Sequence, residues 1–311
     1  MLNSKVALGT MNFASRTSPD ESRRIMDRAL ERGVTVFDTA NVYGDGESER
    51  RIGQALKGRR DAVRIATKVG LLRFGGKPEG LSRARILAAC DESLGRLQTD
   101  FIDVYYLHAP DPLTPIGESL DALARLFEAK KIRAWGVSNF AAWQIGDLNA
   151  ATEARGLPRP AVSQVLYNLL VRQLDVEYFA FARAHPIHTT VYNPLAGGLL
   201  ARVPDVGAPV PKGSRFETNA LYRKRYWTDA MTQGAGQYAA VAAELGLDTV
   251  ALAYAFLASH PGIDSVLCGP ASVAHLDAGL DGCAKTLTDA ARSRIDAVHR
   301  EFVGTDAKYA R

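Results

Sequence analysis

The segment VTVFDTANVY, residues 34–43, runs from β-branched and apolar residues into an aspartate and, after a short stretch, a tyrosine. The apolar run predicts a buried strand that ends near Asp38. A glycine-containing turn follows, and residues 47–56 have the pattern of a helix. This order is typical of a strand, loop and helix unit in which Asp38 and Tyr43 lie at the carboxyl end of the strand.

The same unit recurs along the chain. Strand-like runs alternate with helical patterns, and the eight predicted strands are residues 5–10, 34–37, 63–68, 102–108, 132–138, 162–166, 188–192 and 263–268. This alternation favours parallel pairing with right-handed crossovers, so we predict the α/β class and a (β/α)8 TIM barrel. No linker or low-complexity segment divides the sequence, and we expect a single domain over residues 1–311 with helices at its C-terminal end.

A long insertion separates the seventh and eighth predicted strands. It covers about residues 200–232, begins with a segment containing Pro and Gly, and continues into the arginine-rich and aromatic residues 214–227. Long insertions in compact domains are usually lids or binding loops. The alternative is a disordered excursion, which the aromatic and arginine content disfavours.

Composition excludes several classes of protein. The 38 basic and 34 acidic residues give a net charge of +4 without a basic cluster, so we expect no nucleic-acid partner. No apolar run approaches the roughly 20 residues of a membrane span, and the first residues lead into a strand instead of a signal peptide. The three cysteines are far apart, which disfavours disulfides and metal binding. We expect a soluble cytoplasmic protein without a metal, either a monomer or a homodimer.

Four polar residues at successive strand ends are the candidate catalytic group: Asp38, Tyr43, Lys68 and His108. Taken singly, Lys68 could be a solvated rim residue and His108 a structural histidine, but their joint placement favours chemistry. A lysine ammonium favours a phenolate and lowers the pKa of tyrosine, and a carboxylate would hold the lysine. His108 could orient a carbonyl oxygen or take part in proton transfer. These groups move protons but carry no hydride, so redox chemistry needs a cofactor.

Several short motifs follow one another over almost the whole chain: FDTA at residues 37–40 with Tyr43, Lys68, LH at 107–108, WGVSNF at 135–140, Gln164 with YN at 167–168, NPLAGGLL at 193–200 and YRKRYW at 222–227. In these motifs the sequence resembles the aldo-keto reductases. The closest resemblance is to the aflatoxin aldehyde reductase and succinic semialdehyde reductase subfamily.

This resemblance implies an enzyme that reduces aldehydes or ketones with NADPH, including semialdehydes that carry a carboxylate or dialdehydes. It implies that Tyr43 is the general acid and that His108 positions the carbonyl. The implied cofactor contacts are Ser138, Asn139, Gln164, Tyr192, Asn193, Pro194, Leu195, Gly197, Gly198, Leu199, Arg215, Arg225, Gly269, Ser272 and His275. The implied substrate contacts are His108, Tyr222 and Arg311, the last as a guanidinium that would pair with a carboxylate.

The resemblance weakens after the eighth strand. His275 and Gly279 replace a glutamine and an asparagine that are usual in the segment that grips the adenosine phosphate. NADH is therefore an alternative cofactor. Two other functions remain open: an NAD-linked dehydrogenase of sugars or alcohols, and a cofactor-binding auxiliary or regulatory subunit without turnover.

Overall fold

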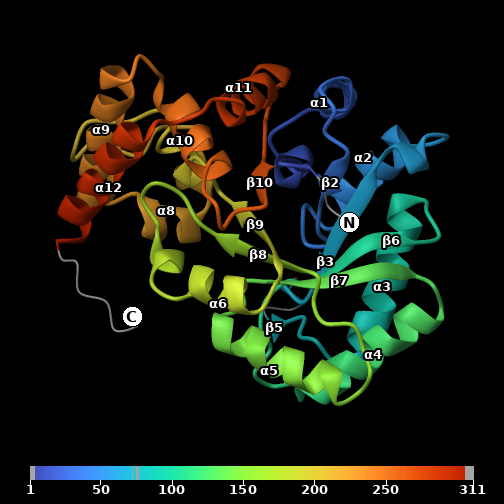
Figure 1. Cartoon of the computed structure of the whole chain (residues 1–311). Helices are drawn as coiled ribbons and strands as arrows, with labels where there is room; N and C mark the ends of the chain where they lie inside the picture. The colour runs from blue at the N-terminus through green and yellow to red at the C-terminus, as the bar shows by residue number, and fades with distance from the viewer. Residues whose placement is uncertain (1–3, 72, 75–76, 305–311) are drawn as a thin grey trace.

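The computed structural model describes residues 4–71, 73–74 and 77–304 of the chain. Its centre is a closed ring of eight parallel strands, surrounded by helices (Figure 1). The predicted (β/α)8 barrel is confirmed, and every predicted strand has its counterpart. In chain order these are β1 (Val6–Gly9), β2 (Val36–Asp38), β3 (Arg64–Val69), β6 (Ile102–Leu107), β7 (Ile132–Ser138), β8 (Val162–Leu166), β9 (His188–Tyr192) and β10 (Ser265–Cys268).

Neighbouring strands pair in the order of the chain, and β1 pairs with β10 to close the ring. Aligned pairs such as Gly9 with Asp38 and Lys68 with Tyr106 bring the carboxyl ends of the strands to one end of the barrel. A separate buried cluster comes from the strands and fills the ring: Ala7, Val36, Ala66, Val104, Tyr106, Ala134 and Val162. The barrel is therefore a packed core, and chemistry belongs at its open rim.

The helices between the strands bury their apolar faces against the outside of the ring. They are α1 (Pro19–Glu31), α2 (Glu47–Ala55), α3 (Arg83–Leu97), α4 (Ile116–Glu128), α5 (Ala142–Glu153) and α6 (Tyr178–Ala184). The start of α1 shows why the sequence forms a helix there. The Ser18 hydroxyl accepts a hydrogen bond from the Glu21 amide at 3.1 Å and Pro19 occupies the first turn, which together satisfy the helix end.

The predicted insertion lies between β9 and β10 and contains helices instead of coil. Two short ones, α7 (Arg215–Thr218) and α8 (Ala220–Tyr226), precede α9 (Asp229–Glu244) and α10 (Thr249–Ala258). The Phe216 and Trp227 rings lie 4.9 Å apart between centroids, so aromatic packing holds α7 against the end of α8. The chain then continues through β10 to α11 (Val273–Cys283) and α12 (Asp289–Val303).

A second feature that was not predicted follows β3. A small antiparallel hairpin, β4 (Arg73–Phe74) with β5 (Lys77–Pro78), lies in the connection that follows β3. Separately, within the described ranges no single helix is long and apolar enough to cross a membrane. The helices α9 and α10 reach that length and composition only together, across an 89° bend.

Candidate functional site

An ion pair lies buried at the ends of β2 and β3. The Lys68 ammonium contacts Asp38 Oδ1 and donates to the Thr39 carbonyl oxygen at 2.8 Å, and the lysine side chain is fully buried. The second carboxylate oxygen of Asp38 accepts a hydrogen bond of 2.8 Å from Gln164 Nε2. Burial lowers the pKa of Lys68, and Asp38 opposes that shift. Asp38 therefore neutralises and orients the lysine.

Tyr43 and His108 lie together above this pair. Their ring centroids are 6.1 Å apart with the planes nearly perpendicular, and the Lys68 nitrogen lies 5.3 Å from the centroid of the Tyr43 ring. The Nδ1 atom of His108 is buried and has no hydrogen-bond partner among the described residues. Burial, with a smaller contribution from Lys68, holds the pKa of His108 well below its usual value. The imidazole is therefore neutral, and its ring lies beside the phenol.

The predicted lowering of the Tyr43 pKa by lysine is wrong. The pKa of Tyr43 is raised well above 10.0, first by burial and then by the Asp38 charge. Burial and the Asp38 charge outweigh the effect of the Lys68 ammonium. Tyr43 therefore keeps its proton over the ordinary pH range.

Three of the predicted cofactor residues are linked by hydrogen bonds at the ends of β7 and β9. Tyr192 donates from its hydroxyl to Asn139 Oδ1 at 2.6 Å. The amide nitrogen of Asn139 in turn donates to Ser138 Oγ at 3.1 Å and to the His108 carbonyl oxygen at 2.9 Å. Asn139 holds a positive φ of 62°, a conformation that asparagine tolerates better than most residues. These hydrogen bonds join the candidate cofactor residues to the catalytic group.

The loop after β9 and the helix α8 lie against each other. Asn193 accepts a hydrogen bond from the Gly197 amide at 2.7 Å and donates to the Tyr226 hydroxyl at 2.7 Å. A Cβ atom on Gly197 would come within 2.8 Å of the Tyr222 ring, and φ is +73° there, so only glycine fits. The loop containing Asn193, Pro194, Leu195, Gly197, Gly198 and Leu199 is thus held by the insertion.

Arg215 reaches across the site. Its guanidinium stacks on the Tyr222 ring, 5.0 Å from the centroid, and donates to Asn12 Oδ1 at 2.5 Å. The amide nitrogen of Asn12 donates to the Gly269 carbonyl oxygen at 2.8 Å. Arg225 lies 6.0 Å from the centroid of the Tyr226 ring. The first loop of the barrel therefore links the insertion to the loop after β10.

Ser272 begins α11, and its hydroxyl accepts a hydrogen bond of 3.2 Å from the His275 amide. The amide of Val273, the residue that follows Ser272, donates to Glu21 Oε1 at 2.9 Å. A carboxylate thus already satisfies one of the free amides at the start of this helix. Any anion at this end of α11 would meet a negative charge.

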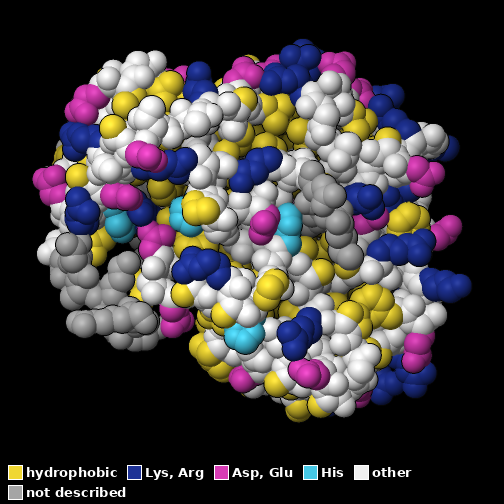
Figure 2. All heavy atoms as spheres, viewed as in Figure 1, with side chains coloured by type: hydrophobic (Ala, Val, Ile, Leu, Met, Phe, Trp, Pro, Cys, Tyr) yellow, Lys and Arg dark blue, Asp and Glu magenta, His cyan; other side chains and the backbone are white. Residues whose placement is uncertain are grey.

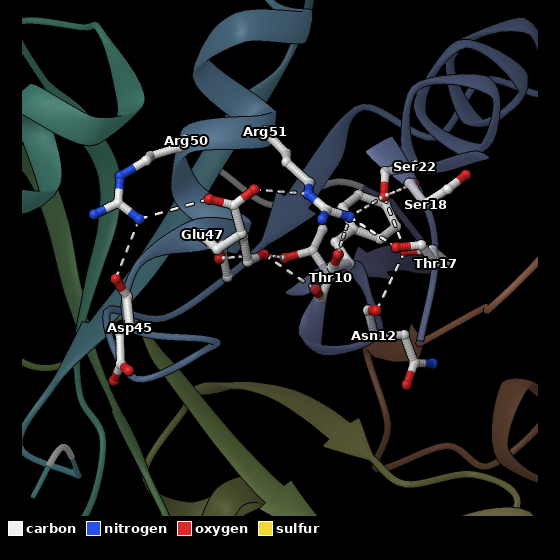
Figure 3. A network of polar contacts seen from close by, with 12 residues as sticks. Thr10, Asn12, Thr17, Ser18, Ser22, Asp45, Glu47, Arg50 and Arg51 are labelled. Carbon is white, nitrogen blue, oxygen red and sulfur yellow. Dashed lines mark hydrogen bonds and ion pairs between the residues drawn. The ribbon is translucent and has the colours of Figure 1, made fainter. Parts of the chain in front are cut away.

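A second polar network joins the loop after β1 to the start of α2 (Figure 3). From α2, Arg51 donates to the Thr17 carbonyl oxygen at 2.9 Å and to Ser22 Oγ at 3.1 Å, and it pairs with Glu47 at 3.0 Å. The same guanidinium contacts the Phe13 carbonyl oxygen. Residues 10–22 and the helix that follows Tyr43 are therefore tied together.

Sequence reasoning missed Asn12 and Glu79. The Glu79 carboxylate accepts hydrogen bonds from Asn41 Nδ2 at 2.9 Å and from the Gly70 amide at 2.7 Å, which joins the loop before Tyr43 to the end of β3. Asn12 contacts Arg215 across 203 residues of sequence. Neither residue carries a local pattern that would reveal such distant partners.

Arg311, the predicted carboxylate contact, lies outside the described residues. Among the residues that the structure does describe, no group of three His, Cys, Asp or Glu side chains could hold a metal ion.

Comparison with known proteins gives a consistent picture. A sequence model described as the Aldo/keto reductase family matches residues 5–300. Human aflatoxin B1 aldehyde reductase member 2 is 34% identical over 292 residues, which is 88% of this chain and 80% of the relative. A probable voltage-gated potassium channel subunit beta of Arabidopsis thaliana is 33% identical over 265 residues, 83% of this chain and 80% of the relative.

A solved structure also matches. The glycerol dehydrogenase from Gluconobacter oxydans superimposes with a TM-score of 0.81 at 28% identity, and the match covers 99% of this chain and 95% of that one. The shared fold extends over the insertion and the C-terminal helices as well as the barrel.

Proposed function

The chain belongs to the aldo/keto reductase family, an oxidoreductase family that works with nicotinamide cofactors on aldehydes and ketones, and on this premise we propose that it reduces aldehydes with NADPH and that Tyr43 donates the proton. The observation that carries the proposal is the grouping of a phenol, an imidazole and a buried lysine–aspartate pair at one end of the barrel.

The residues at the ends of β7 and β9 fit a nicotinamide. Ser138 and Asn139 offer a hydroxyl and an amide, and Tyr192 offers an aromatic ring, all linked by hydrogen bonds. These are the groups that a planar ring with a carboxamide needs. When bound, the cofactor supplies the hydride, which none of these side chains can carry.

The side chains of the site divide the remaining work. His108 is suited to orient a carbonyl oxygen, because its ring lies beside Tyr43 and a neutral imidazole can donate one ring N–H. Tyr43 holds the proton that the oxygen must receive, and its raised pKa keeps that proton in place until negative charge develops on the oxygen. Lys68 places a positive charge beside the phenol, which favours the phenolate once the proton has left.

Tyr43→Phe tests the proton donor. Loss of a general acid costs a factor of about 100 to 10,000 in rate, so we expect kcat for aldehyde reduction to fall by that amount while KM changes little. Steady-state kinetics measure both. Tyr105→Phe is the control, because its hydroxyl makes only a 3.4 Å contact with the Ile86 carbonyl oxygen in the outer core. Full turnover by Tyr43→Phe would remove Tyr43 from this role.

A panel of aliphatic, aromatic and carboxylated aldehydes with NADPH and with NADH tests the substrate and the cofactor. We expect reduction with NADPH to be the fastest reaction. Faster oxidation of glycerol or sugars with NAD would favour the dehydrogenase alternative, in keeping with the glycerol dehydrogenase relative. Cofactor binding without turnover of any substrate would favour an auxiliary subunit, in keeping with the channel-subunit relative.

A further inference from the structure

A cavity of about 590 Å³ lies at the end of the barrel opposite the candidate active site. Its lining includes Arg64, the first residue of β3, whereas Lys68 lies near the end of that strand. The other lining residues come from the starts of the neighbouring strands and the turn before β3: Thr35, Arg60, Asp61, Ala62, Val63, Phe101, Asp103 and Arg133. Lys and Arg side chains gather on the right of the surface in Figure 2, the side on which Figure 1 places α2 and β6.

Arg60 is a structural part of this cavity. Its guanidinium donates to the Val63 carbonyl oxygen at 2.8 Å, to the Phe101 carbonyl oxygen at 3.1 Å and to Asp103 Oδ2 at 2.6 Å. Asp103 also accepts a hydrogen bond of 2.8 Å from the Ile65 amide. Arg60 and Asp103 therefore satisfy each other and hold the wall of the cavity.

Arg133 is held in place without being neutralised. Its guanidinium lies 4.5 Å from the centroid of the Phe101 ring, and Arg60 lies 4.3 Å from the same centroid. Within the described part of the chain, the Arg133 guanidinium makes no hydrogen bond and no ion pair. Stacking on the aromatic ring orients the cation and leaves its N–H donors free.

Arg64 is the second incompletely paired cation. Its nearest carboxylate oxygen, Asp103 Oδ1, is 3.9 Å away, too far for a hydrogen bond, and its side chain is 56% exposed. With Asp103 engaged by Arg60, the cavity retains two arginines against one carboxylate, that of Asp61. This balance favours an anion that both guanidiniums can share.

We propose that this cavity is a binding site for a small phosphate monoester that also carries hydroxyl groups, such as a sugar phosphate. Guanidinium groups match the oxygen atoms of phosphate in paired hydrogen bonds, and Arg64 and Arg133 supply two such groups. The volume is in the range of small-molecule sites and exceeds what a bare ion fills. Asp61 is an acceptor for a ligand hydroxyl. The proposal does not depend on the proposed reductase activity.

Calorimetric titration of the protein with glucose 6-phosphate tests the site. NADP+ is present throughout at a saturating concentration, so that phosphate contacts in the candidate cofactor site are already occupied and no hydride is available to reduce the sugar aldehyde. We expect one binding site whose affinity falls about tenfold or more in Arg133→Gln and, separately, in Arg64→Gln, since each removes charge-assisted hydrogen bonds. Aldehyde reduction should stay unchanged in both variants.

Arg294→Gln is the matched control. Arg294 is another exposed arginine, 46% accessible, on α12. The Arg294→Gln variant should bind glucose 6-phosphate as tightly as the unchanged protein does. A second ligand sharpens the result: inorganic phosphate should bind more weakly than glucose 6-phosphate. The proposal is overturned if glucose 6-phosphate does not bind, if the Arg64 and Arg133 variants bind it as tightly as Arg294→Gln, or if inorganic phosphate binds as tightly as glucose 6-phosphate. Circular dichroism establishes that each variant is folded.

Discussion

Asp38 shows how much of the site depends on a single carboxylate. One of its oxygens holds Lys68 and the other accepts from Gln164, so the same side chain links β2 to β3 and to β8. The sequence predicted that Asp38 holds the lysine, and the structure confirms that contact. The bond from Gln164 was not predicted, because the resemblance assigns that residue to the cofactor, and its cofactor contact stays a prediction.

The buried pair leads to a prediction on stability. Asp38→Asn or Lys68→Met alone leaves an uncompensated buried charge, and each should lower the free energy of unfolding by about 3–5 kcal/mol. The double variant removes both charges and should be more stable than either single variant. Urea unfolding measures all four proteins. A double variant whose loss equals the sum of the two single losses would contradict the pairing.

The two shifted pKa values predict the pH dependence of reduction. His108 has a pKa well below 6.5, so it is neutral at and above that pH, and Tyr43, with a pKa well above 10.0, stays protonated there. The form with neutral imidazole and protonated phenol therefore persists across neutrality. We expect kcat/KM for reduction to be flat from about pH 6.5 to about pH 9 and to fall only when the phenol loses its proton in strong alkali. A bell-shaped profile centred near pH 7 would contradict both shifts.

At the scale of elements, the loop that carries Tyr43 depends on the loop after β1. Gly44 has a φ of +58°, and a Cβ atom there would lie 2.2 Å from the Cβ atom of Ala14. The network around Arg51 also ties the loop after β1 to α2, the helix that follows this turn (Figure 3). The position of Tyr43 therefore depends on a close fit between two loops as well as on its own strand.

Gly44→Ala should disturb this fit. We expect a loss of about 1–3 kcal/mol in the free energy of unfolding, together with a lower kcat, because the clash with Ala14 displaces the turn that holds Tyr43. Adding Ala14→Gly removes the clash but leaves the strained φ, so it should restore part of both quantities. Urea unfolding and steady-state kinetics are the measurements. An unchanged kcat in Gly44→Ala would show that Tyr43 does not depend on this contact.

Elements with a strong local pattern were predicted well, and elements that depend on distant contacts were not. The β-branched runs predicted the strands, and the pattern of residues 47–56 predicted α2, because burial periodicity acts within a few residues. The hairpin β4–β5 has strands of two residues each, too short for a period to show. The insertion was recognised by its length and arginines, but α7 and α8 are short and packed by aromatic residues from their own segment, which the pattern did not reveal.

At the scale of the whole molecule, the candidate cofactor residues come from many parts of the barrel. Asn12 joins the first loop to Arg215 and to Gly269, and Asn139 joins the ends of β7, β9 and β6. The resemblance could place these segments at one site because it covers the chain from end to end. It could not give their hydrogen bonds, since those are set by packing between segments that are far apart in sequence.

A ligand that contacts so many segments should stabilise the whole fold. Binding to the native state at one hundred times Kd adds about 2.7 kcal/mol to the free energy of unfolding. We expect NADPH to raise Tm by several degrees, and NADH at the same concentration to raise it less. Thermal unfolding followed by circular dichroism measures both shifts without any turnover. A larger shift with NADH would point instead to an NAD-linked enzyme, for which the carboxylate of Glu21 beside the start of α11 offers a physical reason.

The pairing of β1 with β10 has a consequence for the order of events during synthesis. Val6 aligns with Val266, so β1 must wait for the synthesis of β10 before its outer edge is covered. Until then a nascent polypeptide carries an incomplete sheet with two open edges, and such edges invite pairing with other chains. Ring closure is a contact of long sequence separation and is slow to form. Productive folding in the cell should therefore be most sensitive to crowding and chaperone supply until β10 has left the exit tunnel.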